Sequence, residues 1–188
     1  MRVPATALVV LGSLAGCGSG GEAFFPLEVG NRWTYSVRAG FLSRVEDVRV
    51  ERALSVADAR GFELTGPMGV SRFVWKEGTL LAEDLPGTRF SPAVPLLVGG
   101  SVKASRNWRG IVRTMAGERE ARGTLVQASD SLTIAGRGYD TRRTTLTVEG
   151  LGPRLELQSW FAEGIGLLRQ EQRIGDQLVR SVEYLAGP

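Results

Sequence analysis

The side chain best suited to covalent chemistry in this sequence is the thiol of Cys17, the single cysteine among 188 residues. Cys17 follows Ala15 and Gly16, two small residues typical of a cleavage site. An apolar stretch over residues 3–14 lies before them, behind the cationic Arg2. This stretch is too short to cross a bilayer as a helix, but it suits the core of a secretory signal peptide. The sequence therefore predicts cleavage before Cys17, with residues 1–16 as the signal peptide.

The residues at the cleavage site also predict lipidation of Cys17. Residues 14–17 read Leu-Ala-Gly-Cys and resemble the lipobox of bacterial lipoproteins. That resemblance implies a diacylglyceryl group on the cysteine sulfur and usually a further acyl chain on the new amino group. Two or more chains hold a protein stably at a membrane, whereas one is marginal. An ordinary secretory signal that contains a cysteine, or an uncleaved N-terminal anchor helix, is the alternative.

Other catalytic chemistry has few candidates in this composition. The chain has no histidine, which excludes Ser-His-Asp and Cys-His catalysis and argues against zinc, copper and haem sites. The adjacent acids Glu46 and Asp47, like Glu83 and Asp84, should point to opposite faces of a strand, so neither pair makes a catalytic couple alone. A pair of distant carboxylates is left open. We expect no catalytic residues, no cofactor and no metal.

The charge pattern indicates solvated surfaces. The chain carries 23 basic and 20 acidic residues, and its only lysines are Lys76 and Lys103. The arginines are scattered, with Arg142 and Arg143 as the one adjacent pair, so the sequence has no basic run to bind nucleic acid. Without a cysteine after Cys17, no disulfide holds the fold together. The length after cleavage suits one domain with its own core.

Alternating apolar residues predict strands along the whole chain after a flexible tether at residues 17–23. The pattern is plainest at residues 31–38, where Trp33, Tyr35 and Val37 share one face. Residues 44–56 favour a strand with a bulge near Glu46, with a helix as the alternative. The proline-rich residues 84–101 suggest a long connection between two halves. We expect one all-β domain over residues 24–188, an antiparallel meander that forms a strongly curved sheet or partly open barrel.

Two short motifs recur in the same order and raise the possibility of two similar halves. Pro-Leu-x-Val-Gly occurs at residues 26–30 and again at 95–99, and an aromatic-x-Glu-Gly turn occurs at residues 75–78 and 161–164. The residues involved are common, so a chance match is an alternative to duplication.

The first motif also resembles the start of a group of bacterial envelope lipoproteins. Residues 24–35 read Phe-Phe-Pro-Leu-Glu-Val-Gly-Asn-Arg-Trp-Thr-Tyr and are similar to the Phe-Pro-Leu-x-x-Gly-Asn-x-Trp-x-Tyr start of that group. A later landmark of the group resembles residues 160–168. The resemblance implies a single β-rich domain of unknown function and no catalytic residues.

Together these features predict a lipid-anchored envelope protein that acts by non-covalent binding. The expected client is a lipid, another apolar ligand or a protein segment, with membrane contact through the lipid on Cys17. The alternatives are an assembly protein that presents a strand edge or aromatic patch to a protein partner, and a polysaccharide hydrolase with two carboxylates. Gly18 and Ser19 lack the aspartate that retains enteric lipoproteins at the inner membrane, which favours the outer membrane where one exists.

Overall fold

The computed structural model describes residues 21–188. The predicted signal peptide, the lipobox and Cys17 lie outside the described residues. Of the predicted tether, residues 21–23 are described.

The described chain consists of twelve strands and one short 3-10 helix. The elements are η1 (Glu22–Phe24), β1 (Arg32–Ala39), β2 (Leu42–Val56), β3 (Ala59–Gly66), β4 (Gly69–Lys76), β5 (Thr79–Leu85), β6 (Thr88–Val98), β7 (Ala104–Thr114), β8 (Gly117–Ile134), β9 (Arg137–Glu149), β10 (Leu155–Ala162), β11 (Gly166–Ile174) and β12 (Gln177–Ala186). Across residues 21–188, no helix is long and apolar enough to cross a membrane.

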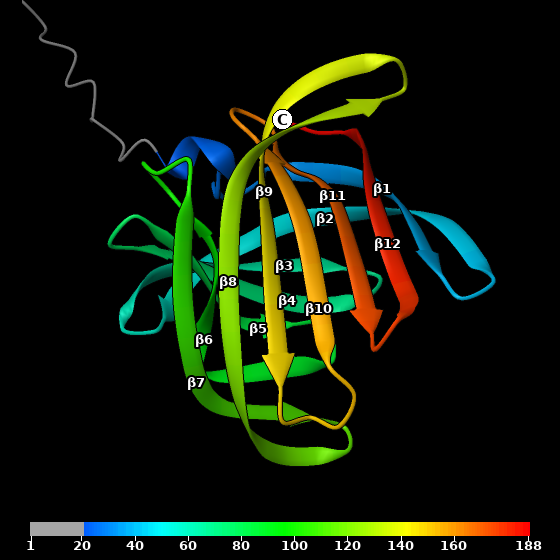
Figure 1. Cartoon of the computed structure of the whole chain (residues 1–188). Helices are drawn as coiled ribbons and strands as arrows, with labels where there is room; N and C mark the ends of the chain where they lie inside the picture. Colours follow the sequence, from blue (N-terminus) through cyan, green and yellow to red (C-terminus); the bar gives the residue numbers. More distant parts are fainter. Residues whose placement is uncertain (1–20) are drawn as a thin grey trace, which may run out of the picture.

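All twelve strands pair antiparallel with their neighbours in sequence, and β1 then pairs with β12 to close a barrel (Figure 1). At this closure Tyr35 of β1 lies opposite Tyr184 of β12, and Val37 lies opposite Val182. The predicted all-β antiparallel meander is confirmed. Within residues 21–188 the sheet closes on itself, and these residues also supply both buried clusters.

Strand β2 differs from its prediction in the phase of its first residues. It is a strand and not a helix, and its irregular register lies between Val50 and Arg52 instead of near Glu46 and Asp47. No bulge therefore brings Val45 to the inner face. Val45 points outward and is 67% exposed, while Glu46 faces the interior and is 3% exposed.

The predicted long connection at residues 84–101 is wrong, because β6 occupies Thr88–Val98. Strand β6 pairs with β7 only from Thr88 to Ser91, and beyond that point it pairs with β5 alone. Pro92 and Pro95 lack the N–H group that a central strand needs, which explains why the second half of β6 leaves β7. Residues 94–98 are all buried as β6 turns into the barrel.

The N-terminal segment closes one end of the barrel. The carbonyl of Ala23 accepts a 2.7 Å hydrogen bond from the Gly164 N–H in the β10–β11 turn. Gly21 packs against Gly99 so closely that a Cβ built on Gly21 would lie 2.5 Å from the Gly99 Cα. Residues 21–23 are therefore part of the folded domain, which corrects their assignment to the flexible tether.

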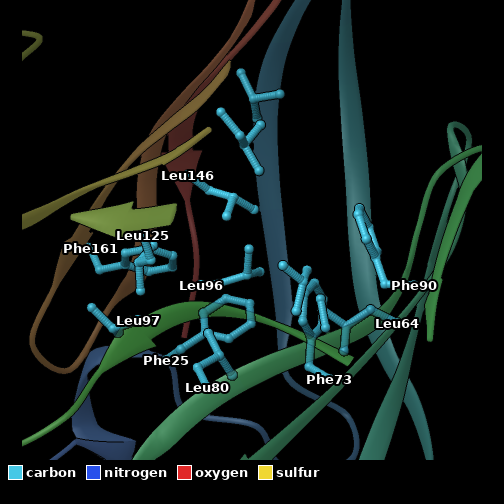
Figure 2. Packing of buried hydrophobic residues seen from close by; sticks show 14 of the residues in the cluster. Phe25, Leu64, Phe73, Leu80, Phe90, Leu96, Leu97, Leu125, Leu146 and Phe161 are labelled. Carbon is cyan, nitrogen blue, oxygen red and sulfur yellow. The ribbon is translucent and has the colours of Figure 1, made fainter. Parts of the chain in front are cut away.

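Phe25 is the centre of this closed end and of the main core (Figure 2). Its ring stacks on Trp33 with centroids 5.5 Å apart and meets Phe73 and Phe161 edge-on. Trp75 donates its indole N–H to the Phe25 carbonyl at 3.1 Å, which ties the segment to β4. Trp33 is fully buried, as its alternation with Tyr35 predicts. The aromatic residues Phe25, Trp33 and Tyr35 at the start of the domain are thus core residues.

Of the two recurring motifs, the Glu-Gly turns occupy matching places, because they join β4 to β5 and β10 to β11. The Pro-Leu-x-Val-Gly copies do not, because residues 26–30 lie outside any strand, whereas residues 95–98 form the end of β6. The lead-in to β1 bonds the second turn through Ala23 and Gly164. The lead-in to β7 bonds the first turn, through the Gly99 N–H and the Gly78 carbonyl. The turn donates in the first of these bonds and accepts in the second, so the two contacts are not equivalent.

We expect Phe25→Ala to destabilise the domain by about 3 to 5 kcal/mol, because it removes a large buried side chain from a packed core. Urea unfolding followed by tryptophan fluorescence measures the change. Phe41→Ala is the matched control, since Phe41 is fully exposed in the β1–β2 turn, and its effect should stay within about 0.5 kcal/mol. Equal effects of the two substitutions would contradict the role assigned to Phe25.

Candidate functional site

The barrel interior contains a cavity of about 130 Å³. Phe25 and Trp33 form its floor at the closed end. Met68 in the β3–β4 turn and Pro86 in the β5–β6 turn lie at the other end, which we call the mouth. The cavity is therefore an internal space between the plugged end and these two turns.

Most of the cavity lining is apolar. One side, the apolar wall, is formed by inward side chains of strands β3 to β6, β9 and β10: Leu64, Phe73, Leu85, Phe90, Leu146, Leu155 and Leu157. Several of these residues also belong to the main core (Figure 2). An apolar ligand would lose its contact with water on this side.

Polar side chains gather on the remaining side of the cavity. This polar wall consists of Glu46 from β2, Gln170 and Gln172 from β11, and Arg180 from β12. Gln172 lies directly opposite Arg180 in the β11–β12 pairing. Buried polar groups need partners, so their position next to a cavity makes them candidate ligand contacts.

Glu46 is a buried carboxylate with a cationic partner. Its side chain is 2% exposed, and it forms an ion pair with the Nε of Arg44, whose side chain is half exposed. Arg44 precedes Glu46 by two positions on the same face of β2, toward the β1–β2 turn. The pair therefore joins the interior of the barrel to its surface.

Two buried atoms of the polar wall, Oε1 of Glu46 and Nε of Arg180, have no hydrogen-bond partner among residues 21–188, but only Glu46 also has an ion pair, with Arg44. Burial lowers the pKa of Arg180, Glu46 raises it and Arg44 lowers it. A guanidinium keeps its charge at neutral pH despite such a shift, so Arg180 presents a positive charge to the cavity.

Tyr35 contributes a buried ring beside the polar wall. Its ring meets that of Tyr184 edge-on, with centroids 6.5 Å apart. Burial, together with Tyr184, raises the pKa of Tyr35 well above its ordinary value. The Tyr35 phenol is therefore protonated and neutral at every physiological pH.

The acidic pairs considered from sequence differ in their arrangement. Glu46 points inward, whereas Asp47 lies outside and accepts a hydrogen bond from Thr34 at 2.7 Å, so this pair is split as expected. Glu83 and Asp84 do not separate cleanly, because a register shift in β5 lets both contact Arg89. Among residues 21–188, no group of three or more acidic, histidine or cysteine side chains is placed to hold a metal ion.

The polar wall was not singled out from the sequence, although a signal for it exists. Arg180 lies two positions before the buried Val182 on the same face of β12, and both residues line the cavity. A polar residue within an apolar phase is the signal. Glu46 was hidden because the expected bulge assigned it to the outer face.

A second set of buried charge lies outside the barrel and is structural. Glu63 on the outer face of β3 accepts hydrogen bonds from Arg52 at 2.9 Å and from Arg72 at 3.1 Å, and Arg72 also bonds Asp84. These bonds, chiefly the one from Arg52, hold the pKa of Glu63 below its ordinary value. Each carboxylate of this cluster has an arginine partner, which indicates cross-strand stabilisation.

Comparison with known proteins identifies the fold. No protein-family model and no curated protein matches the chain. Several solved structures do match, and two of them cover nearly the whole fold. One is a candidate lipoprotein from Parabacteroides distasonis, with 11% identity and a TM-score of 0.53. Another is a candidate exported protein with a YmcC-like fold from Bacteroides fragilis, with 10% identity and a TM-score of 0.53. Each comparison covers 88% of this chain and 98% of the other. The chain therefore shares the architecture of these proteins.

We expect Glu63→Gln to lower stability at neutral pH and to lose this effect in acid. The pKa of Glu63 is lower in the folded than in the unfolded chain, so its ion pairs stabilise the fold above the unfolded pKa. That contribution disappears as the pH falls through the folded pKa. Urea unfolding at about pH 7 and about pH 3 measures the difference. Glu149→Gln, at an exposed acid, is the control. A pH-independent difference between Glu63→Gln and wild type would contradict the assignment.

Proposed function

We propose that this protein is a lipid-anchored lipoprotein of the cell envelope and a non-catalytic binding module, with the barrel cavity as its binding site. The cavity carries the proposal, because it is a concave, largely apolar space in a barrel whose other interior positions are packed. Ligand sites are typically concave and apolar with a few polar groups that fix orientation.

The size of the cavity limits the ligand class. An engineered apolar cavity of about 150 Å³ in another protein binds benzene. A cavity of about 130 Å³ therefore suits one small apolar molecule or the end of a longer chain. A complete membrane lipid would need more room than the packed core leaves.

The lining supports binding rather than hydrolysis. Hydrolysis of a polysaccharide by the usual route needs two carboxylates facing the same bond. Among the described residues that line the cavity, Glu46 is the one acid, and it is paired with Arg44. The cavity thus offers no second carboxylate to complete such a couple.

The envelope location is supported by the amino-terminal sequence and by the solved structures of this fold. Residues 14–17 match a lipobox, and the two similar proteins are described as a candidate lipoprotein and a candidate exported protein. Gly18 and Ser19 favour the outer membrane in a host that has one.

One observation favours an assembly role as a second candidate. Strand β7 pairs with β6 only through residues 111–114, so along residues 104–110 one edge of β7 has no strand partner in the described chain. An extended segment of another protein can bind such an edge by adding a strand.

We expect native mass spectrometry of the full chain, expressed in its host and purified from the envelope, to show a non-covalently bound small molecule at one copy per chain. Solvent extraction then identifies it. Ser71→Phe, which adds a ring to the lining, should lose the ligand, whereas Ser131→Phe at an exposed site should retain it. A ligand-free mass for the wild type would contradict the cavity proposal. Crosslinking from Asn107 on β7 would then test the assembly role.

We expect Cys17→Ser to abolish incorporation of labelled fatty acid into the full chain, because Cys17 is the single thiol available. Radiolabelled palmitate and gel electrophoresis provide the measurement, and Ser19→Ala is the control that should still incorporate label. Label retained by Cys17→Ser would show that the chain is not acylated through this thiol.

A further inference from the structure

The polar wall, together with the neighbouring Arg44, carries more positive than negative charge. Arg180 and Glu46 are the charged side chains that line the cavity, and the half-exposed Arg44 lies beside Glu46 and adds a second positive charge nearby. Glu46 is already paired with Arg44. The positive charge of Arg180 is therefore not neutralised by an anion of its own.

The placement of Arg180 would make this charge costly in an empty cavity. Its Nε is buried and unpartnered, and a buried donor left without an acceptor destabilises the fold. Gln172 lies opposite Arg180 and also lines the cavity, so its amide could share a bound acceptor. An oxygen atom of a ligand at this position would satisfy the donor from inside the barrel.

The apolar wall determines the chemistry of the rest of the ligand. Leu64, Phe73 and Leu157 of the apolar wall line the same continuous space as Arg180. A molecule that contacts both walls must have a polar end and an apolar end. Phosphate-sized groups with two charges would leave one charge unmatched, since Arg180 is the single cation to spare.

We propose that the ligand of the cavity is a small monocarboxylate amphiphile, whose carboxylate binds Arg180 and whose hydrocarbon part lies against the apolar wall. This inference rests on the proposed function and narrows it to a ligand class. An ionised carboxylate accepts the charged hydrogen bond from Arg180, and its single negative charge balances the wall. A neutral ligand of the same shape would leave the guanidinium unpaired.

Binding of hexanoate and of 1-hexanol to residues 21–188, measured by isothermal titration calorimetry at about pH 7, tests the proposal. The two probes share an apolar chain and differ in charge. We expect wild type to prefer hexanoate by roughly tenfold, the effect of one charged hydrogen bond. Arg180→Met should abolish this preference while still binding hexanol. Arg122→Met, at an exposed site on β8, should keep it.

The outcomes separate the two proposals. Equal binding of hexanoate and hexanol by wild type overturns the carboxylate inference but leaves the apolar site standing. Binding of neither probe overturns the site itself. If Arg180→Met does not fold, as judged by urea unfolding, Arg180→Lys replaces it. Lysine keeps the charge but lacks the Nε donor, so it should retain part of the preference, and an unchanged or absent preference would contradict the role of that donor.

Discussion

The pairing of β1 with β12 is the constraint on which the rest of the structure depends. Closure gives every strand an inner and an outer face and fixes the interior volume through the strand number. Eight strands enclose a space that side chains alone can fill, whereas twelve enclose more. This barrel fills the excess with Phe25 from the N-terminal segment and with Val94, Leu96, Leu97 and Val98 of β6, which belong to the main core. The cavity is the part of the interior that these two insertions leave open.

The polar wall places charged side chains in an otherwise apolar interior, and this burial of charge costs free energy. Taking a charge out of water costs several kcal/mol unless a partner is close. Glu46 meets that requirement through Arg44, a residue that reaches solvent. The Nε of Arg180 does not meet it within the described chain. Burial alone would favour an apolar residue at position 180. The arginine found there is instead suited to binding a ligand.

The sequence predicts the fold better than the site. Regular alternation, as in Trp33, Tyr35 and Val37, reports burial directly, and it predicted the strands and their antiparallel order. Where alternation stops, prediction fails: the prolines of β6 concealed a strand, because a proline is tolerated where one side of the strand has no ladder. Glu46 and Arg180 come together from β2 and β12, at opposite ends of the chain. Their proximity depends on barrel closure, which no local pattern encodes.

The position of the N-terminal segment determines which way the cavity opens. Gly21 and Ala23 lie at the plugged end, and Cys17 precedes Gly21 by only four residues, a span of at most about 14 Å. With the anchor proposed at Cys17, the plugged end faces the bilayer and the mouth faces away from it. A ligand would then enter from the aqueous compartment and not by lateral diffusion out of the anchoring leaflet. Such an orientation suits a receptor for soluble molecules better than a protein that extracts lipids from its own membrane.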